Sequence, residues 1–206
     1  MADTVFGITY NGGVIIAADQ SNGRSILTYQ KNLDKIAKLT DYSMMGVSGA
    51  NSDLVQFTQY VSKNINLYEI SNEGTKLSTH AQANFARGEL ATAIRKGPYQ
   101  VNVLIGGYDA GKQGAPGSVS LYYLDYFGAL HKVKYGAQGY AQYFCASIFD
   151  REYKENLTEE EAIKILGKCI LEMKTRFMLS QPNFIMKKVD KDGVSVLSFG
   201  EDPADT

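Results

Sequence analysis

The fold is decided by residues 4–19, which read Thr4-Val5-Phe6-Gly7-Ile8-Thr9-Tyr10-Asn11-Gly12-Gly13-Val14-Ile15-Ile16-Ala17-Ala18-Asp19. Two runs of β-branched, aromatic and other apolar residues flank Asn11-Gly12-Gly13, and this is the strongest hairpin signal in the chain. The second run is apolar at nearly every position. That pattern predicts a central strand that is buried on both faces.

Three charged residues recur at equal intervals around this hairpin. Asp3 precedes the first run, Asp19 ends the second, and Lys35 comes just before the next apolar run, sixteen positions apart each time. Strand–turn–strand geometry can bring all three to one end of a sheet, where active-site groups often sit. We interpret Asp19 and Lys35 first as a structural pair, because a buried lysine without its carboxylate is costly.

The rest of the chain alternates between blocks of strand and blocks of helix. Further strands are expected at 36–39, 43–48, 101–108, 118–124, 129–133, 183–189 and 194–199. Apolar residues at helical spacing predict a first helix whose buried face is Leu54, Phe57, Val61, Ile65 and Tyr68. A second helix follows, a third over 140–149 is expected to be largely buried, and a fourth opens with a capping box of Thr158 and Glu161.

The order of these elements is strands, two helices, strands, two helices, strands. This order favours an α+β fold with two stacked antiparallel sheets and helices on both outer faces. At 206 residues the chain fits one domain over 1–206, within which we expect the acidic tail at 201–206 to be loose.

Composition argues against several classes of function. Lys and Arg number 21 against 22 Asp and Glu, so the formal charge of −1 favours neither nucleic acid nor an anionic membrane. No apolar run approaches the ~20 residues of a membrane span, and the first residues lack a secretory-signal pattern. The two histidines and two cysteines have no metal-ligand spacing, so we expect no metal and no cofactor. Cys145 and Cys169 are expected to be small buried hydrophobes in a reducing compartment.

Several ordered blocks together carry a resemblance to a known family. They are the opening through Lys35-Ile36, Val55-Gln56-Phe57, residues 98–109, Gly136–Tyr140 and residues 189–193. The chain resembles the beta-type subunits of the proteasome core particle, and among these it is most similar to the non-catalytic class at the fourth ring position. The resemblance implies the four-layer αββα sandwich of N-terminal nucleophile hydrolases, which agrees with the order of elements.

The same resemblance implies that catalytic groups are missing. Catalytic relatives use an N-terminal threonine sixteen residues before the strand-end aspartate, and that position is Asp3 here, which has no hydroxyl to supply. The family has a serine where this chain has Gln138, and an aspartate where it has Phe177, while Ser180 is retained. We therefore expect no catalytic residue, only vestigial positions.

The function implied is that of a structural, non-catalytic subunit. Its expected partners are other beta subunits in the same and the opposite ring and alpha subunits of the adjacent ring, and its expected location is the cytoplasm and nucleus. Two alternatives stay open at this point. Trimming could expose Thr4 as the nucleophile of an active threonine-type endopeptidase, although a shift of one residue along a strand points the side chain to the opposite face. The other alternative is a free-standing metabolic amidohydrolase or ligand-binding domain, which would be stable and functional alone.

Overall fold

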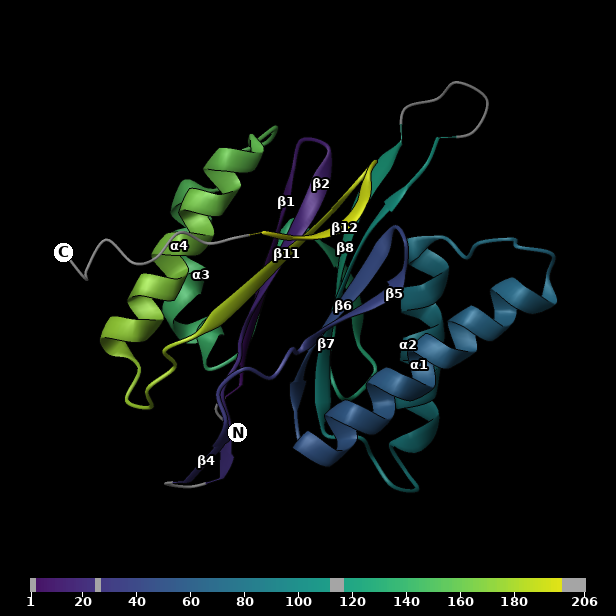
Figure 1. The fold of residues 1–206 in the computed structure, drawn as a ribbon, viewed down its shortest axis with the longest axis horizontal. Helices are drawn as coiled ribbons and strands as arrows, with labels where there is room; N and C mark the ends of the chain where they lie inside the picture. The colour runs from purple at the N-terminus through teal and green to yellow at the C-terminus, as the bar shows by residue number, and fades with distance from the viewer. Residues whose placement is uncertain (1–2, 25–26, 112–116, 198–206) are drawn as a thin grey trace.

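Four layers make up the protein, as its computed structural model shows for residues 3–24, 27–111 and 117–197 (Figure 1). Two five-stranded antiparallel sheets lie face to face, and a pair of helices covers the outer face of each. This is the αββα sandwich, so the expected fold class is confirmed.

The first sheet has the strand order β10-β1-β2-β11-β12. Its strands are β1 (Thr4–Tyr10), β2 (Gly13–Asp19), β10 (Tyr135–Gly139), β11 (Phe184–Asp190) and β12 (Gly193–Leu197). Its outer face is covered by α3 (Ala141–Glu152) and α4 (Glu159–Arg176). The sheet therefore combines the two ends of the chain with one strand from its middle.

The second sheet has the order β5-β6-β7-β8-β9 and follows the chain without crossovers. Its strands are β5 (Ile36–Thr40), β6 (Ser43–Gly49), β7 (Val101–Asp109), β8 (Ser118–Leu124) and β9 (Leu130–Val133). The helices α1 (Asn51–Ser71) and α2 (Thr79–Ala93) cover its outer face. A small ribbon of β3 (Asn22–Arg24) and β4 (Leu27–Gln30) stands apart from both sheets.

The hairpin predicted at the start of the chain forms as expected. Tyr10 pairs with Gly13, so Asn11 and Gly12 make the turn, in which Gly12 adopts a φ of +108° that favours glycine. Every residue of β2 is buried, because β2 lies in the middle of its sheet with the second sheet on one face and helices on the other.

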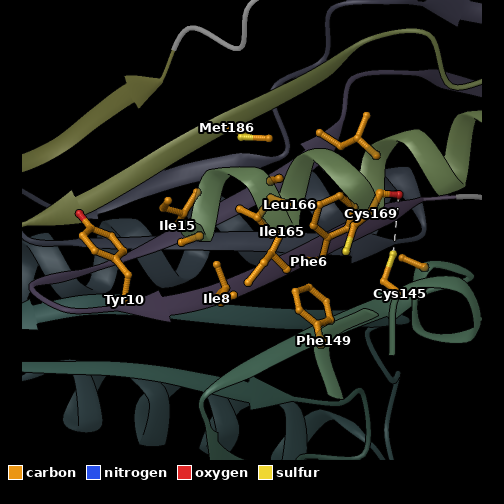
Figure 2. Close-up of a cluster of buried hydrophobic side chains, with 14 of the residues drawn as sticks. Phe6, Ile8, Tyr10, Ile15, Cys145, Phe149, Ile165, Leu166, Cys169 and Met186 are labelled. Carbon is orange, nitrogen blue, oxygen red and sulfur yellow. Dashed lines mark hydrogen bonds between the residues drawn. The ribbon is translucent and has the colours of Figure 1, made fainter. Parts of the chain in front are cut away.

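Strand β1 divides its side chains between two cores. Phe6 and Ile8 point outward to α3 and α4, where they contact Phe149 and its neighbours (Figure 2). Val5 points inward, to the core between the sheets. This alternation follows from the two-residue period of a strand. It also applies to Asp3, just before β1, and to Thr4, its first residue.

The two cysteines also lie in the outer core. Cys145 and Cys169 are fully buried on facing helices, and the Sγ of Cys145 lies 3.9 Å from the carbonyl oxygen of Cys169 (Figure 2). Both are free thiols, as the sequence indicated.

The sheets approach each other closely where glycines face valines. A Cβ built on Gly106 would lie 2.8 Å from Cγ1 of Val14, and one on Gly46 would lie 2.8 Å from Cγ1 of Val5. Neither glycine has a positive φ, so space and not backbone strain restricts these positions. The contact holds the hairpin strands against the second sheet.

Some details of the sequence prediction were wrong. Tyr68 is 41% exposed, and Ile65 is the last buried residue of α1. Helix α3 is amphipathic and not largely buried: Tyr143 is 74% exposed. Strand β10 was not predicted as a strand, since its glycines and small side chains lack a strand pattern.

Three further expectations concern the start of α4, the C-terminal residues and membrane-spanning helices. The capping box of Thr158 and Glu161 is present in both directions at the start of α4. Phe199 and the acidic tail at 201–206 lie outside the described residues. Within the described residues, no helix is both long and apolar enough to cross a membrane.

The close approach of the two sheets yields a stability prediction. Replacing Gly106 by valine should lower the free energy of unfolding by about 1–3 kcal/mol, because the stiff side chain of Val14 cannot move away. The control is Gly88→Ala in the exposed middle of α2, where nothing lies within 4 Å of the new Cβ. It should raise stability by about 0.5–1 kcal/mol. Thermal unfolding of both variants, measured in the same assembly state, checks this prediction. Equal changes in the free energy of unfolding would contradict the close packing at Gly106.

Candidate functional site

The ammonium group of Lys35 is the centre of a buried cluster. Its Nζ lies 2.6 Å from Oδ1 of Asp3, 2.9 Å from each carboxylate oxygen of Asp19 and 2.8 Å from the carbonyl oxygen of Ser21. The Lys35 side chain is fully buried. The three charged residues spaced sixteen apart are therefore brought together, as the sequence predicted.

Strand pairing explains why these residues meet. The pairing of Val5 with Ala18 is antiparallel, so the start of β1 lies beside the end of β2, and this places Asp3 near Asp19. Lys35 precedes β5 in the other sheet, and its carbonyl oxygen accepts a hydrogen bond from the N–H of Val47 in β6. The cluster thus links the ends of strands in both sheets.

Asp19 accepts four hydrogen bonds from three donor groups. Besides the ammonium of Lys35, which contacts both oxygens, the N–H of Thr4 donates to Oδ1 at 2.8 Å and the N–H of Ser21 donates to Oδ2 at 3.2 Å. Burial raises the pKa of the Asp19 carboxyl to about 6, although the ammonium of Lys35 and the N–H of Thr4 oppose the rise. The folded state therefore keeps this proton at a higher pH than an unfolded chain does.

Asp3 contacts a second donor besides Lys35. Its Oδ2 accepts a hydrogen bond from the backbone N–H of Gly49 at 3.1 Å. Gly49 ends β6 with a φ of +150°, and a Cβ there would lie 2.1 Å from the carbonyl oxygen of Gln100. Glycine is therefore required at the residue whose N–H faces the Asp3 carboxylate.

The hydroxyl of Thr4 is directed elsewhere. Thr4 Oγ1 donates to Oε1 of Gln181 at 2.9 Å, and the Thr4 side chain is fully buried. Thr4 shares the outward face of β1 with Phe6, while Asp3 lies on the inward side with Val5. The one-residue shift expected to separate the two side chains is therefore observed.

The remaining vestigial positions are Gln138, Phe177 and Ser180. The Gln138 amide accepts from the hydroxyl of Ser48 and donates to the carbonyl oxygen of Leu124. Phe177 packs its ring 5.3 Å from that of Tyr140, in the aromatic margin of the outer core. Ser180 is exposed. The structure thus joins Asp3, Asp19 and Lys35 in one cluster, while Gln138 and Phe177 make contacts outside it.

Sequence reasoning missed three parts of the site. The N–H of Gly49, the carbonyl of Ser21 and the amide of Gln181 all contact the cluster or its neighbour Thr4. Side-chain patterns do not predict which backbone groups contact a site. A glycine that ends a strand could have indicated such a backbone contact. Gln181 had none, since it lies 177 positions from the residue that it contacts.

The three side chains of the cluster carry charge and no hydroxyl group. Asp3 stands where the resemblance places a hydroxyl, and a carboxylate that is ion-paired to an ammonium can orient or hold charge. Within the described residues, no group of three or more His, Cys, Asp or Glu side chains could hold a metal ion.

Comparison with known proteins identifies the family. A family model described as "Proteasome subunit" matches residues 1–189. The chain belongs to the proteasome subunit family. It is 51% identical over 191 residues to the proteasome subunit beta type-2-B of Arabidopsis thaliana, covering 93% of each chain.

Two less similar relatives are also beta-type proteasome subunits. The chain is 41% identical to the proteasome subunit beta type-2 of Dictyostelium discoideum, covering 96% of this chain and 98% of that one. It is 39% identical to the proteasome subunit beta type-4 of Saccharomyces cerevisiae, covering 93% and 95%. The resemblance to beta-type proteasome subunits is therefore confirmed over nearly the whole chain.

The cluster predicts a large effect when its cation is removed. Lys35→Met would leave the buried carboxylate of Asp19 and the partly buried one of Asp3 without a cation, and should lower the free energy of unfolding by about 3–5 kcal/mol at neutral pH. The control is Lys38→Met, whose ion pair with Asp41 is exposed to water, so that its loss should change stability far less.

The loss should also depend on pH. Asp19 already has a pKa raised to about 6 in the folded state, so its contribution to stability falls as pH rises from about 4 through 6. Without Lys35 the pKa of the Asp19 carboxyl rises further, and lowering the pH from 7 to 5 should restore more stability to Lys35→Met than to the wild type. Unfolding measured at both pH values checks this; a loss that is the same at both would contradict it.

Proposed function

We propose that this chain is a non-catalytic, structural beta subunit of the proteasome core particle, at the fourth position of the beta ring. It completes the ring and forms part of the wall of the chamber in which other subunits degrade proteins, including those marked by ubiquitin. The proposed location is the cytoplasm and the nucleus, where such particles work on intracellular proteins.

One observation carries the non-catalytic assignment. The carboxylate of Asp3 occupies the position beside Lys35 at which a nucleophile would have to stand, and it is bound there by both the ammonium of Lys35 and the N–H of Gly49. A carboxylate in an ion pair cannot be activated by loss of a hydroxyl proton. The chemistry of a threonine peptidase therefore has no starting group at this site.

The surface supports a role in assembly. Large apolar side chains are exposed on helices of both outer layers, among them Tyr60, Leu67 and Ile70 of α1 and Tyr143 of α3. Such side chains are common where proteins contact partners. We assign these surfaces to neighbouring beta subunits, the opposite beta ring and the adjacent alpha ring.

The alternative, an active peptidase that uses Thr4, has less support. The Thr4 hydroxyl donates to Gln181, and the Thr4 N–H donates to Asp19, so neither the hydroxyl nor the nitrogen is directed at Lys35. Activity would require trimming of Asp3 together with a change in the direction of the Thr4 side chain. That trimming would also remove one of the two carboxylates that bind Lys35.

Covalent labelling tests the proposal. Particles in which the known peptidase subunits are inactivated genetically are treated with a Thr-directed covalent inhibitor. The intact mass of this chain is then measured. We expect an unlabelled chain that keeps the residues before Thr4. A labelled chain that begins at Thr4 would establish the alternative.

Restoring a threonine should not restore activity by itself. In the variant Ala2→Gly, Asp3→Thr the nucleophile would lie beside Asp19 and Lys35, but Gln138 and Phe177 remain where the family has hydrogen-bonding groups. Catalytic groups that work as a unit fail together, so this variant should stay unlabelled. Labelling should require Gln138→Ser and Phe177→Asp as well, and labelling of the first variant alone would show that these positions are not needed.

A further inference from the structure

The dipeptide Asn-Gly occurs twice in the chain, at Asn11-Gly12 and at Asn22-Gly23. Asparagine loses its side-chain amide most easily before glycine, because glycine has no side chain to keep its backbone nitrogen away from the preceding residue. The two copies share this chemistry, so a difference between them has to come from the fold around each one.

The first copy forms the turn between β1 and β2. Tyr10 pairs with Gly13 across the hairpin. Asn11 and Gly12 are therefore the loop between them, and both are exposed. In the described part of the chain, neither the Asn11 side chain nor the Gly12 N–H makes a hydrogen bond. The side-chain carbonyl carbon of Asn11 and the nitrogen of Gly12 are thus free to approach each other.

The second copy is restrained by its contacts. In the β3–β4 ribbon Gly23 pairs with Thr28, and Asn22 also pairs across the ribbon. The Oδ1 atom of Asn22 accepts a hydrogen bond from Nδ2 of Asn51 at 2.5 Å. A reaction between the Asn22 side chain and the nitrogen of the next residue requires these contacts to open first.

We propose that Asn11 is a site of spontaneous deamidation, and that the fold protects Asn22 from the same reaction. The nitrogen of Gly12 forms a bond to Cγ of Asn11, and the side-chain nitrogen leaves with the displaced proton as ammonia. The product is a cyclic imide that includes the backbone. Water then opens the imide at either carbonyl carbon: attack at Cγ gives aspartate, and attack at the backbone carbonyl carbon gives isoaspartate.

The two products differ in their effect on the hairpin. Aspartate keeps the length of the backbone and adds a negative charge. Isoaspartate continues the chain through the side chain, which adds a backbone carbon atom to the loop between Tyr10 and Gly13. The N–H of Asn11 donates to the carbonyl oxygen of Leu157 at 2.8 Å, just before Thr158, the N-cap of α4. We therefore expect isoaspartate to weaken the contact between the hairpin turn and the start of α4.

Ageing of the assembled particle tests the proposal. The full chain is kept with its partner subunits at neutral pH and physiological temperature, and peptides that contain each Asn-Gly pair are followed by mass spectrometry. The mass difference between an amide and a carboxyl group detects deamidation, and electron-based fragmentation distinguishes isoaspartate from aspartate. Asn11 should convert at least about tenfold faster than Asn22, which reacts only through local opening of the ribbon. Both products should form at Asn11.

Matched variants separate the role of the fold from that of the local sequence. Asn51→Ala removes the donor to the Asn22 side chain, so it should speed conversion at Asn22 and leave the rate at Asn11 unchanged. Short synthetic peptides with the two sequences lack the fold, so they should convert at similar rates. Asn11→Asp carries the charge without the longer backbone, and its amide at this position should exchange hydrogen more slowly than the amide of the isoaspartate form.

Two results would overturn the proposal. Conversion at Asn11 that is no faster than conversion at Asn22 in the particle would show that the exposed turn is not the reactive site. Aspartate formed without isoaspartate would show that the amide is lost by direct hydrolysis and not through the imide. Neither result bears on the proposed non-catalytic role, which covalent labelling tests separately.

Discussion

A single buried ammonium group has to be satisfied for this fold to exist in its observed form. Lys35 lies in a fully buried position, where an unpaired charge would cost several kcal/mol, and its three N–H groups are met by Asp3, by Asp19 and by the carbonyl of Ser21. These partners come from the start of β1 and from the end of β2 and the residues after it. The need to pair one cation therefore fixes where the first hairpin lies against the second sheet.

The charged cluster can stabilise the fold of this family independently of any catalytic role. A cation between strand ends can activate a hydroxyl group that lies beside it, and under the proposed non-catalytic role it pairs with a carboxylate here. In this chain the carboxylate is Asp3, while Thr4 is on the other side of β1 and donates to Gln181. The charges of the site can persist without activity because they also stabilise the structure.

Much of this was predictable from the sequence, for physical reasons that differ between elements. The β1–β2 hairpin, the burial of β2 and the capping box at Thr158 follow from local patterns, and so does the meeting of the three charged residues at the strand ends. Strand β10 escaped prediction because it forms through its pairing with β1, not through its own propensity. The donor at Gly49 and the acceptor at Gln181 were missed because their partners lie 46 and 177 positions away in the chain.

The central claim is that Asp3 and Lys35 depend on each other, and a double-mutant cycle measures this dependence directly. Free energies of unfolding are compared for the wild type, Asp3→Asn, Lys35→Met and the double variant, all in the same assembly state. If the carboxylate of Asp3 binds the ammonium as described, the two substitutions should be strongly non-additive, with a coupling of about 1 kcal/mol or more. Additivity within about 0.5 kcal/mol would show that the two residues act independently, and would contradict the account.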